Sequence, residues 1–216
     1  MDLAITAGSW FGLIGANGSG KTSLLRGLAG RLPFASGSCR ISGREVGEDR
    51  AARAAWFGFA PPADRLPDSL RGRDALELVG GDIEEVLLLL GPLSEALGLA
   101  PLLDHWIGNC SAGMRQRIAI AAAFAGGHAH VILDEPFNWL DPVAIFDLRQ
   151  VLRQMVSDGL TLITALHDLT TLAAACDTGV MLADGRVAMI LDEDMLRAGA
   201  RDLQAFERQT IDLLRT

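Results

Sequence analysis

One lysine is found among the 19 lysine and arginine residues of this 216-residue chain, and it stands where phosphate chemistry would need one. Lys21 is the seventh residue of a run with the spacing G-x-x-x-x-G-K-[ST], which begins at Gly15. A lysine ammonium is a compact charge with three donors, and it fits between neighbouring phosphates better than a planar guanidinium does. The spacing therefore predicts a loop that binds the phosphates of a nucleotide. The residues of this predicted loop are Gly15, Ala16, Asn17, Gly18, Ser19, Gly20, Lys21, Thr22 and Ser23.

The segments on either side of the run predict the local structure that such a loop needs. Residues 10–14 are apolar and short enough for a buried strand, and residues 22–30 carry leucines at helical spacing. A strand, a glycine-rich loop and a helix in this order direct backbone N–H groups and the positive end of the helix dipole toward one anion. The Thr22 hydroxyl is then the expected ligand of a magnesium ion.

A second apolar run ends in two acidic residues, at Val131-Ile132-Leu133-Asp134-Glu135. A buried parallel strand here would place both carboxylates at the edge of the sheet where open α/β proteins bind ligands. Asp134 would hold magnesium beside Thr22, and Glu135 would orient and polarise an attacking water. An acidic pair after a strand also occurs as a helix cap or a turn. The phosphate loop favours the catalytic interpretation.

Strand-like and helical segments alternate through the chain, which indicates an α/β fold with a mostly parallel sheet. The predicted strands are residues 10–14, 38–41, 56–60, 131–133 and 160–165, with a hairpin at 180–190 that turns at Asp184-Gly185. The predicted helical segments are residues 22–30, 71–106 with a break at Gly91-Pro92, a helix from Ser111, 142–156 and 201–214. We expect the strands at 38–41 and 56–60 to form a small β subdomain after the first helix.

The composition restricts the classes of partner and compartment. The net charge is -8 and the isoelectric point is near 4.9, whereas a nucleic-acid-binding protein shows a basic face or stripe, so no nucleic-acid partner is expected. No apolar run of about 18 residues is free of polar or helix-breaking residues, and no leader segment is recognisable, so we expect a cytoplasmic protein. Cys39, Cys110 and Cys176 lie far apart and indicate neither a disulfide framework nor a zinc site.

Residues 109–117 read Asn-Cys-Ser-Ala-Gly-Met-Arg-Gln-Arg, and here the chain resembles the ATP-binding cassette (ABC) ATPases, whose signature is L-S-G-G-Q. Ser111 and Gly113 match this signature, while Cys110, Ala112 and Met114 depart from it. A serine cap at a helix start forms a second end that can bind phosphate. The resemblance implies that Ser111 and Gly113 face the nucleotide held by the opposite subunit of a dimer.

Two further segments carry the resemblance. The segment at 136–141, with Leu140-Asp141-Pro142, is similar to the D-loop of the family, which places Asp141 at the dimer interface near both nucleotides. His167 follows the predicted strand at 160–165 and looks like the switch histidine that reaches the γ-phosphate. A lone histidine at a strand end is usually structural, but its place after the other motifs favours the functional interpretation.

Two departures from the family pattern concern the nucleotide. Pro62 occupies the position of a glutamine that contacts magnesium, and proline has no side-chain oxygen for a metal. Asp64 could substitute, although an exposed loop acid is the better interpretation. The family also places an adenine-stacking aromatic some two dozen residues before the phosphate loop, whereas this chain starts 14 residues before Gly15. Trp10 is too near the loop to replace that aromatic, and we expect it in the core.

The resemblance covers nearly the whole chain and implies one cassette at residues 1–216. It implies a P-loop NTPase RecA-like core at about 1–70 and 116–216, an antiparallel β subdomain, and an α-helical insert at about 71–115. It further implies ATP and Mg²⁺ as cofactors, a homo- or heterodimer of cassettes that closes on two Mg-ATP, and Lys21, Glu135 and His167 as catalytic residues. A separate transmembrane permease would hold the chain at the inner face of the cell membrane. The motif style is most similar to that of bacterial exporter cassettes.

Two alternatives remain at this point. The first is an ABC-type ATPase of DNA repair or translation, although such proteins usually carry a long coiled coil or two cassettes in one chain. The second is a nucleotide-binding regulator with little turnover, which Pro62 and the short segment before Gly15 suggest.

Overall fold

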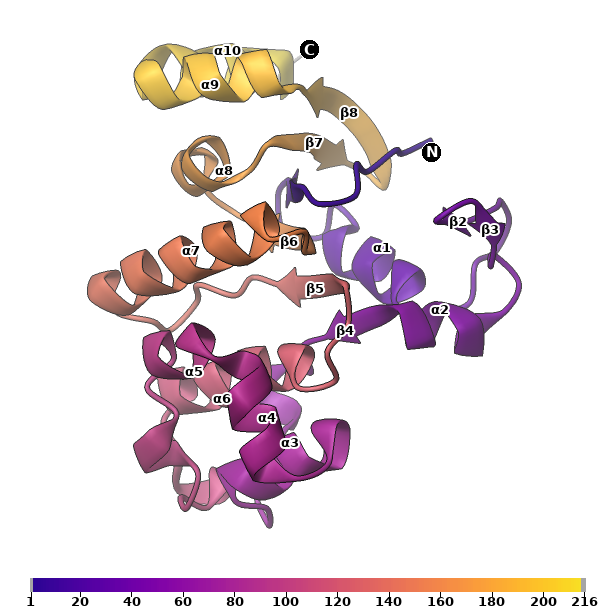
Figure 1. The fold of residues 1–216 in the computed structure, drawn as a ribbon. Coiled ribbons are helices and arrows are strands. Elements are labelled where there is room, and N and C mark those ends of the chain that lie inside the picture. The colour runs from indigo at the N-terminus through magenta and orange to yellow at the C-terminus, as the bar shows by residue number, and fades with distance from the viewer. Residues whose placement is uncertain (1, 215–216) are drawn as a thin grey trace.

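A six-stranded sheet runs through the middle of the molecule in the order β4-β5-β6-β1-β7-β8 (Figure 1). Every neighbouring pair is parallel except β7 and β8, which form an antiparallel hairpin at one edge. This computed structural model describes residues 2–214. The strands of the sheet are β1 (Trp10–Ile14), β4 (Phe57–Phe59), β5 (His130–Asp134), β6 (Thr161–Leu166), β7 (Thr178–Ala183) and β8 (Arg186–Leu191). The mixed α/β fold with a mostly parallel sheet is as predicted.

Helices cover both faces of the sheet, with α1 and α2 on one side and α6, α7 and α8 on the other (Figure 1). The α-helices are α1 (Lys21–Leu28), α2 (Arg50–Trp56), α3 (Gly72–Gly80), α4 (Ile83–Leu90), α5 (Pro92–Ala96), α6 (Ala112–Phe124), α7 (Pro142–Ser157), α8 (Leu169–Ala175), α9 (Glu193–Arg201) and α10 (Leu203–Leu214). Short 3₁₀ turns lie at Ala63–Arg65, Ala100–Leu102 and Ile107–Asn109. No helix within residues 2–214 is long and apolar enough to cross a bilayer.

Alternate residues of the strands feed two separate apolar cores, because successive side chains of a strand point to opposite faces. Val131 and Leu133 of β5 belong to the cluster formed with α6 and α7, whereas Ile132 belongs to the cluster formed with α1. All three side chains are fully buried. The strand therefore reads as an unbroken apolar run, as expected for a parallel sheet covered on both faces.

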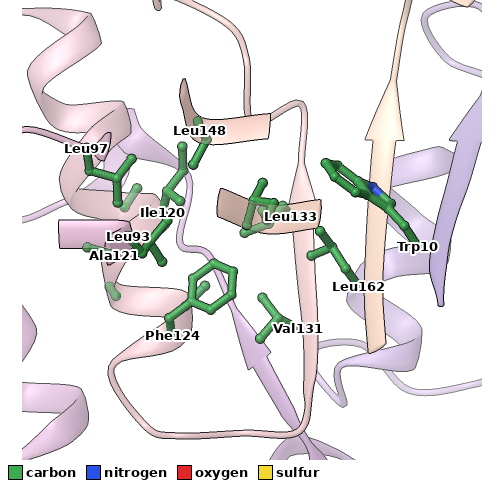
Figure 2. Packing of buried hydrophobic residues seen from close by; sticks show 14 of the residues in the cluster. Trp10, Leu93, Leu97, Ile120, Ala121, Phe124, Val131, Leu133, Leu148 and Leu162 are labelled. Atoms are coloured by element: carbon green, nitrogen blue, oxygen red, sulfur yellow. The ribbon is translucent and has the colours of Figure 1, made fainter. Parts of the chain in front are cut away.

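The core under α6 is the larger of the two clusters. Figure 2 shows Ile120, Ala121 and Phe124 of α6 beside Val131 and Leu133 of β5. Four of the five residues at 119–123 are alanines, so the side chains on this helix are small, and every residue from 118 to 124 is buried. The result is a close contact between α6 and the sheet that fixes where the helix begins.

The small antiparallel sheet differs from the expectation. It consists of β2 (Arg40–Ile41) and β3 (Arg44–Glu45) alone, and these strands are two residues each. The predicted strand at 56–60 is β4 of the main sheet, where it pairs in parallel with β5. Gly58 permits this pairing, because a Cβ atom at this position would lie 1.9 Å from the Ala123 carbonyl oxygen of α6.

The C-terminal region contains the predicted hairpin and one helix that was not predicted. Asp184 and Gly185 have φ values of 48° and 73°, the left-handed pair that a tight two-residue hairpin turn needs. The helix predicted at 201–214 is α10, and α9 precedes it with Asp192 as its N-cap. Gly199 of α9 lies against the Phe206 ring, which packs the two helices together.

Candidate active site

The carboxyl ends of β1, β5 and β6 meet at one edge of the sheet. The register places Ile14 opposite Leu166, and Asp134 opposite Ala165. The residues that follow these strands are therefore brought to the same level, which is where open α/β sheets bind ligands. The segments concerned carry the phosphate loop, the acidic pair and His167.

The phosphate loop has the backbone that its glycines predict. Gly18 and Gly20 have φ values of 83° and 102°, and Gly20 is the N-cap of α1. Gly15 is required for close approach, because a Cβ atom there would lie 2.3 Å from the Leu182 carbonyl oxygen. Lys21 is only 6% exposed, and its Nζ donates to the carbonyl oxygens of Gly15 (2.7 Å) and Ala16 (3.3 Å). The ammonium is held at the loop, where phosphate oxygens could accept the same donors.

Thr22 and Asp134 lie side by side behind the loop. The Thr22 hydroxyl is near enough to the Asp134 carboxylate to oppose the rise of its pKa, and the carboxylate oxygen Oδ1 is buried without a partner. Burial raises the pKa of Asp134 above its usual range, and this exceeds the opposing effects of Thr22, Arg26 and Lys21. Magnesium prefers hydroxyl, carboxylate and phosphate oxygens. An orphaned carboxylate oxygen beside a threonine hydroxyl fits that ion.

Glu135 lines an open pocket of about 450 Å³ at the same edge of the sheet. Its backbone is left-handed, with φ 50°, and its N–H donates to the Ala165 carbonyl of β6. The Oε2 atom accepts a hydrogen bond of 2.7 Å from Asn138 Nδ2 and lies 3.9 Å from His167 Nδ1. The side chains that line the pocket are Asn17, Glu135, Asn138, Trp139 and His167. The predicted base, the predicted switch histidine and the phosphate loop thus share one cavity.

Gln116 supports this arrangement from α6. The side chain is 9% exposed, and Nε2 donates to the carbonyl oxygens of Pro136 (3.2 Å) and Glu135 (3.4 Å). The helix that begins at the signature therefore fixes the backbone on which Glu135 stands.

The signature residues lie outside the pocket. Ser111 caps α6 by accepting a hydrogen bond from the Met114 N–H at 3.2 Å. Gly113 gives room to the neighbouring loop, because a Cβ atom there would lie 2.6 Å from the Trp139 carbonyl oxygen. Neither residue is among those that line the pocket. The exposed Ser111 is left on the surface of the chain.

Asp141, the third residue assigned to the dimer interface, also acts locally. It caps α7 by accepting from the Ala144 N–H and pairs with Arg117 at 3.2 Å. The backbone hydrogen bond from Ala144 is the main reason that the pKa of Asp141 is lowered. Its side chain is 57% exposed, so it remains available to a second molecule.

The residues connected with the two departures from the family pattern can be placed in the structure. Pro62 precedes the 3₁₀ turn at Ala63–Arg65, and the Asp64 side chain is 79% exposed beside Arg65. Asp64 is therefore an exposed loop acid, as interpreted from the sequence. Trp10 is fully buried, and its indole N–H donates to Thr164 Oγ1 at 2.9 Å. The expectation that Trp10 belongs to the core is confirmed.

Asn138 and Trp139 were missed by the sequence interpretation. Both follow the acidic pair, both line the pocket, and Trp139 is 74% exposed with a left-handed φ of 66°. The available signal was an aromatic residue in a polar turn between two motifs. Such a residue has no apolar periodicity that would place it in the core.

A family model for ABC transporters matches residues 1–138, which is more than half of the chain. A putative ABC transporter ATP-binding protein from Halobacterium salinarum is 33% identical over 207 residues, covering 94% of this chain and 89% of that protein. The chain belongs to the ABC transporter family. The EcsA ABC-type transporter ATP-binding protein of Bacillus subtilis is 31% identical over 82% of the chain and 73% of its own length.

Larger members of the family contain a similar segment. Human phospholipid-transporting ATPase ABCA7 is 32% identical over 188 residues, and the chain spans about 9% of the length of that relative. Among solved structures, an ATP-binding subunit of an ABC transporter has a TM-score of 0.82 at 27% identity, covering 98% of this chain and 90% of that one. A dimeric cassette bound to ADP and phosphate after hydrolysis has the same fold, with a TM-score of 0.78 at 22% identity over 88% of each chain. This ABC cassette is an ATP-binding ATPase of the P-loop NTPase fold.

Proposed function

We propose that this ABC cassette closes as a head-to-tail dimer around two Mg-ATP and drives transport, in the direction of export, through a separate transmembrane permease. The observation that carries the proposal is the division of the predicted site within one chain. Asn17 of the phosphate loop, Glu135 and His167 line one pocket, and Lys21 is held against the same loop, whereas Ser111 and Gly113 lie outside the pocket. A second copy that presents its signature helix would complete each pocket.

The predicted catalytic and metal-binding residues each have a chemical role in this proposal. Lys21 neutralises the β- and γ-phosphates, and Thr22 with Asp134 would hold Mg²⁺, which supplies charge neutralisation on the phosphate oxygens. Glu135 orients the attacking water and accepts its proton. His167, whose Nδ1 lies 3.9 Å from Glu135 Oε2, donates to the γ-phosphate. The capped N-terminus of α6 in the second copy contributes Ser111 and its helix dipole.

The proposal includes a location and a division of labour within the chain. The cassette would work in the cytoplasm, held at the inner face of the cell membrane by the permease, as a homodimer or heterodimer. Residues of about 1–70 and 116–216 would form the catalytic core, and the helical insert of about 71–115 would move relative to it. The transported substrate is recognised by the permease in this arrangement.

A nucleotide-binding regulator with little turnover is the second candidate. Pro62 offers no side-chain oxygen at the position of the glutamine, and the exposed Asp64 pairs with Arg65. A steady-state ATPase measurement with and without membranes that contain the permease separates the two. A transporter subunit hydrolyses ATP in this assay, whereas a regulator does not.

Glu135→Gln tests the proposed chemistry, because the amide keeps the shape of the side chain and loses the basic charge. We expect ATP to bind normally, turnover to fall by at least about a hundredfold, and a closed dimer to accumulate in light scattering. Glu84→Gln, on the exposed first turn of α4, is the control and should behave as the parent chain. Normal turnover by Glu135→Gln would assign the base to another residue, and a monomer at saturating ATP would reject the dimer.

A further inference from the structure

We propose that Asn138 is a positioning residue that holds Glu135 in the orientation needed to accept a proton from water. The inference rests on the proposed role of Glu135 as the base. Asn138 lies on the loop between the acidic pair and Asp141, and it lines the pocket.

The contact between the two side chains has only one chemical interpretation. An ionised carboxylate accepts hydrogen bonds and cannot donate them, so the amide Nδ2 of Asn138 must be the donor in the 2.7 Å contact to Glu135 Oε2. Hydrogen bonds to a charged acceptor are short and strong. Within residues 2–214, Oε1 of Glu135 receives no hydrogen bond, so the amide fixes one oxygen and leaves the other without a protein partner.

The backbone of the loop is shaped to make this contact. The Asn138 N–H donates to the Glu135 carbonyl oxygen at 3.3 Å, which closes a turn and brings both side chains to the same side. Glu135 and Trp139 on either side of the turn have left-handed φ values of 50° and 66°. Left-handed conformations of large residues persist only where surrounding contacts hold them, and they concentrate at functional sites.

Two contacts from α6 hold the turn. Gln116 donates to the carbonyl oxygen of Pro136 inside it, and Gly113 leaves space for the carbonyl oxygen of Trp139 at its end. The turn is therefore supported on both sides by the helix that begins at the signature. Asn138 stands on a fixed backbone, which is what a positioning side chain requires.

His167 explains why the position of Glu135 needs to be fixed. Its Nδ1 lies 3.9 Å from the same oxygen, Oε2, that accepts from Asn138. Without the amide, the carboxylate could turn onto the imidazole and shorten this contact. A shorter contact would withdraw the base from the water and His167 from the γ-phosphate. Asn138 occupies Oε2 with a neutral donor and holds the two groups at their observed separation.

The test compares Asn138→Leu, which is similar in size and has no donor, with the parent chain. We expect kcat to fall by about 10- to 100-fold, the loss typical of a small misplacement of a catalytic group, with the ATP dissociation constant changed by less than about twofold. Asn138→Ser keeps a shorter donor and should recover part of the rate. Gln154→Leu removes an exposed amide-to-carboxylate hydrogen bond of 3.0 Å on α7 and is the matched control, with kcat unchanged.

A double-mutant cycle separates positioning from a general effect on the fold. In a Glu135→Ala background, Asn138→Leu should change the single-turnover rate by less than about twofold, because Asn138 then has no carboxylate to hold. A full additional loss in that background, or a parental kcat for Asn138→Leu beside an inactive Glu135→Ala, overturns the inference. Parental turnover by Glu135→Ala itself instead overturns the proposed function, so the two failures are distinguishable.

Discussion

Strand β5 contributes both to the apolar core under α6 and to the carboxyl edge of the sheet, and its residues have opposite environments in the two regions. In the core, Val131 and Leu133 of β5 are completely buried among apolar side chains (Figure 2). One residue later, Asp134 Oδ1 is buried without a hydrogen bond, and Glu135 has a left-handed backbone. Uncompensated polar groups and strained backbone are costly, and proteins retain them where function needs them. Along β5, the residues that stabilise the fold end at Leu133, and the residues suited to chemistry begin at Asp134.

Among variants that alter the carboxyl edge of the sheet and not the core, Lys21→Ala is expected to have the largest effect on ATP binding and hydrolysis. Removing the ammonium leaves the β- and γ-phosphates without their main positive partner, so we expect ATP binding to weaken and hydrolysis to fall by at least about a thousandfold. Thermal unfolding without nucleotide should be close to that of the parent chain, because no core side chain changes. Titration calorimetry measures the binding. ATP affinity equal to that of the parent would contradict the assignment of the phosphate loop.

Leu148→Ala should have the opposite profile, a loss of stability with the edge intact. Leu148 of α7 is fully buried in the cluster under α6. Truncation of a buried leucine to alanine costs about 2–5 kcal/mol, which chemical denaturation measures. ATP affinity below the unfolding range should remain within about twofold. Val143→Ala on the exposed side of the same helix is the control, with little change expected. Equal stability of both variants would show that the cluster does not carry the fold.

The smallest expected effect is a gain in stability from Asp134→Asn. Burial raises the pKa of Asp134, so the protonated form favours folding below the usual pKa and that contribution is lost as the pH rises through the raised value. At neutral pH the uncharged amide should raise the unfolding temperature by about 2–4 °C, the shift that about 1 kcal/mol gives in a domain of this size. The gain should vanish in acid.

The same Asp134→Asn variant should lose ATP hydrolysis, because the amide removes the charge proposed to hold Mg²⁺. A variant with a higher unfolding temperature and a lower ATPase rate would show most clearly that the edge of the sheet and the core differ. A variant that is less stable than the parent at neutral pH would instead show that the ionised carboxylate stabilises the fold. Differential scanning calorimetry across the pH range decides between the two.

Most of the fold followed from periodicity and from turn residues. β1, α7 and the hairpin at Asp184-Gly185 were placed within one or two residues, because each combines an apolar pattern with a clear end signal. The strand predicted at 56–60 was expected in the small antiparallel sheet, and this prediction was wrong because β4 pairs with β5 of the main sheet. A three-residue strand contains no information on its partner, and the contact of Gly58 with α6 that selects β5 is visible only in three dimensions.

The site was predictable where a motif fixes both residue type and spacing. The phosphate loop, Asp134 and His167 were predicted in this way, and the parallel register brings the segments that carry them to one edge of the sheet. Asn138 and Gln116 could not be found, because their partners are a side chain and backbone carbonyls set by a turn with unusual φ values. Local sequence patterns predict elements, but they do not predict which donor meets which acceptor.

Because Lys21 is the only lysine of the chain, the whole molecule carries one side-chain amine, and that amine lies in the phosphate loop with 6% of its surface exposed. Acylating or carbamylating reagents that act on lysine side chains have a single target atom, Nζ. Modification there removes the charge, and in the proposed site bound phosphates would shield the same atom. Labelling of this one lysine, measured by mass spectrometry of the peptide that contains it, would therefore report nucleotide occupancy.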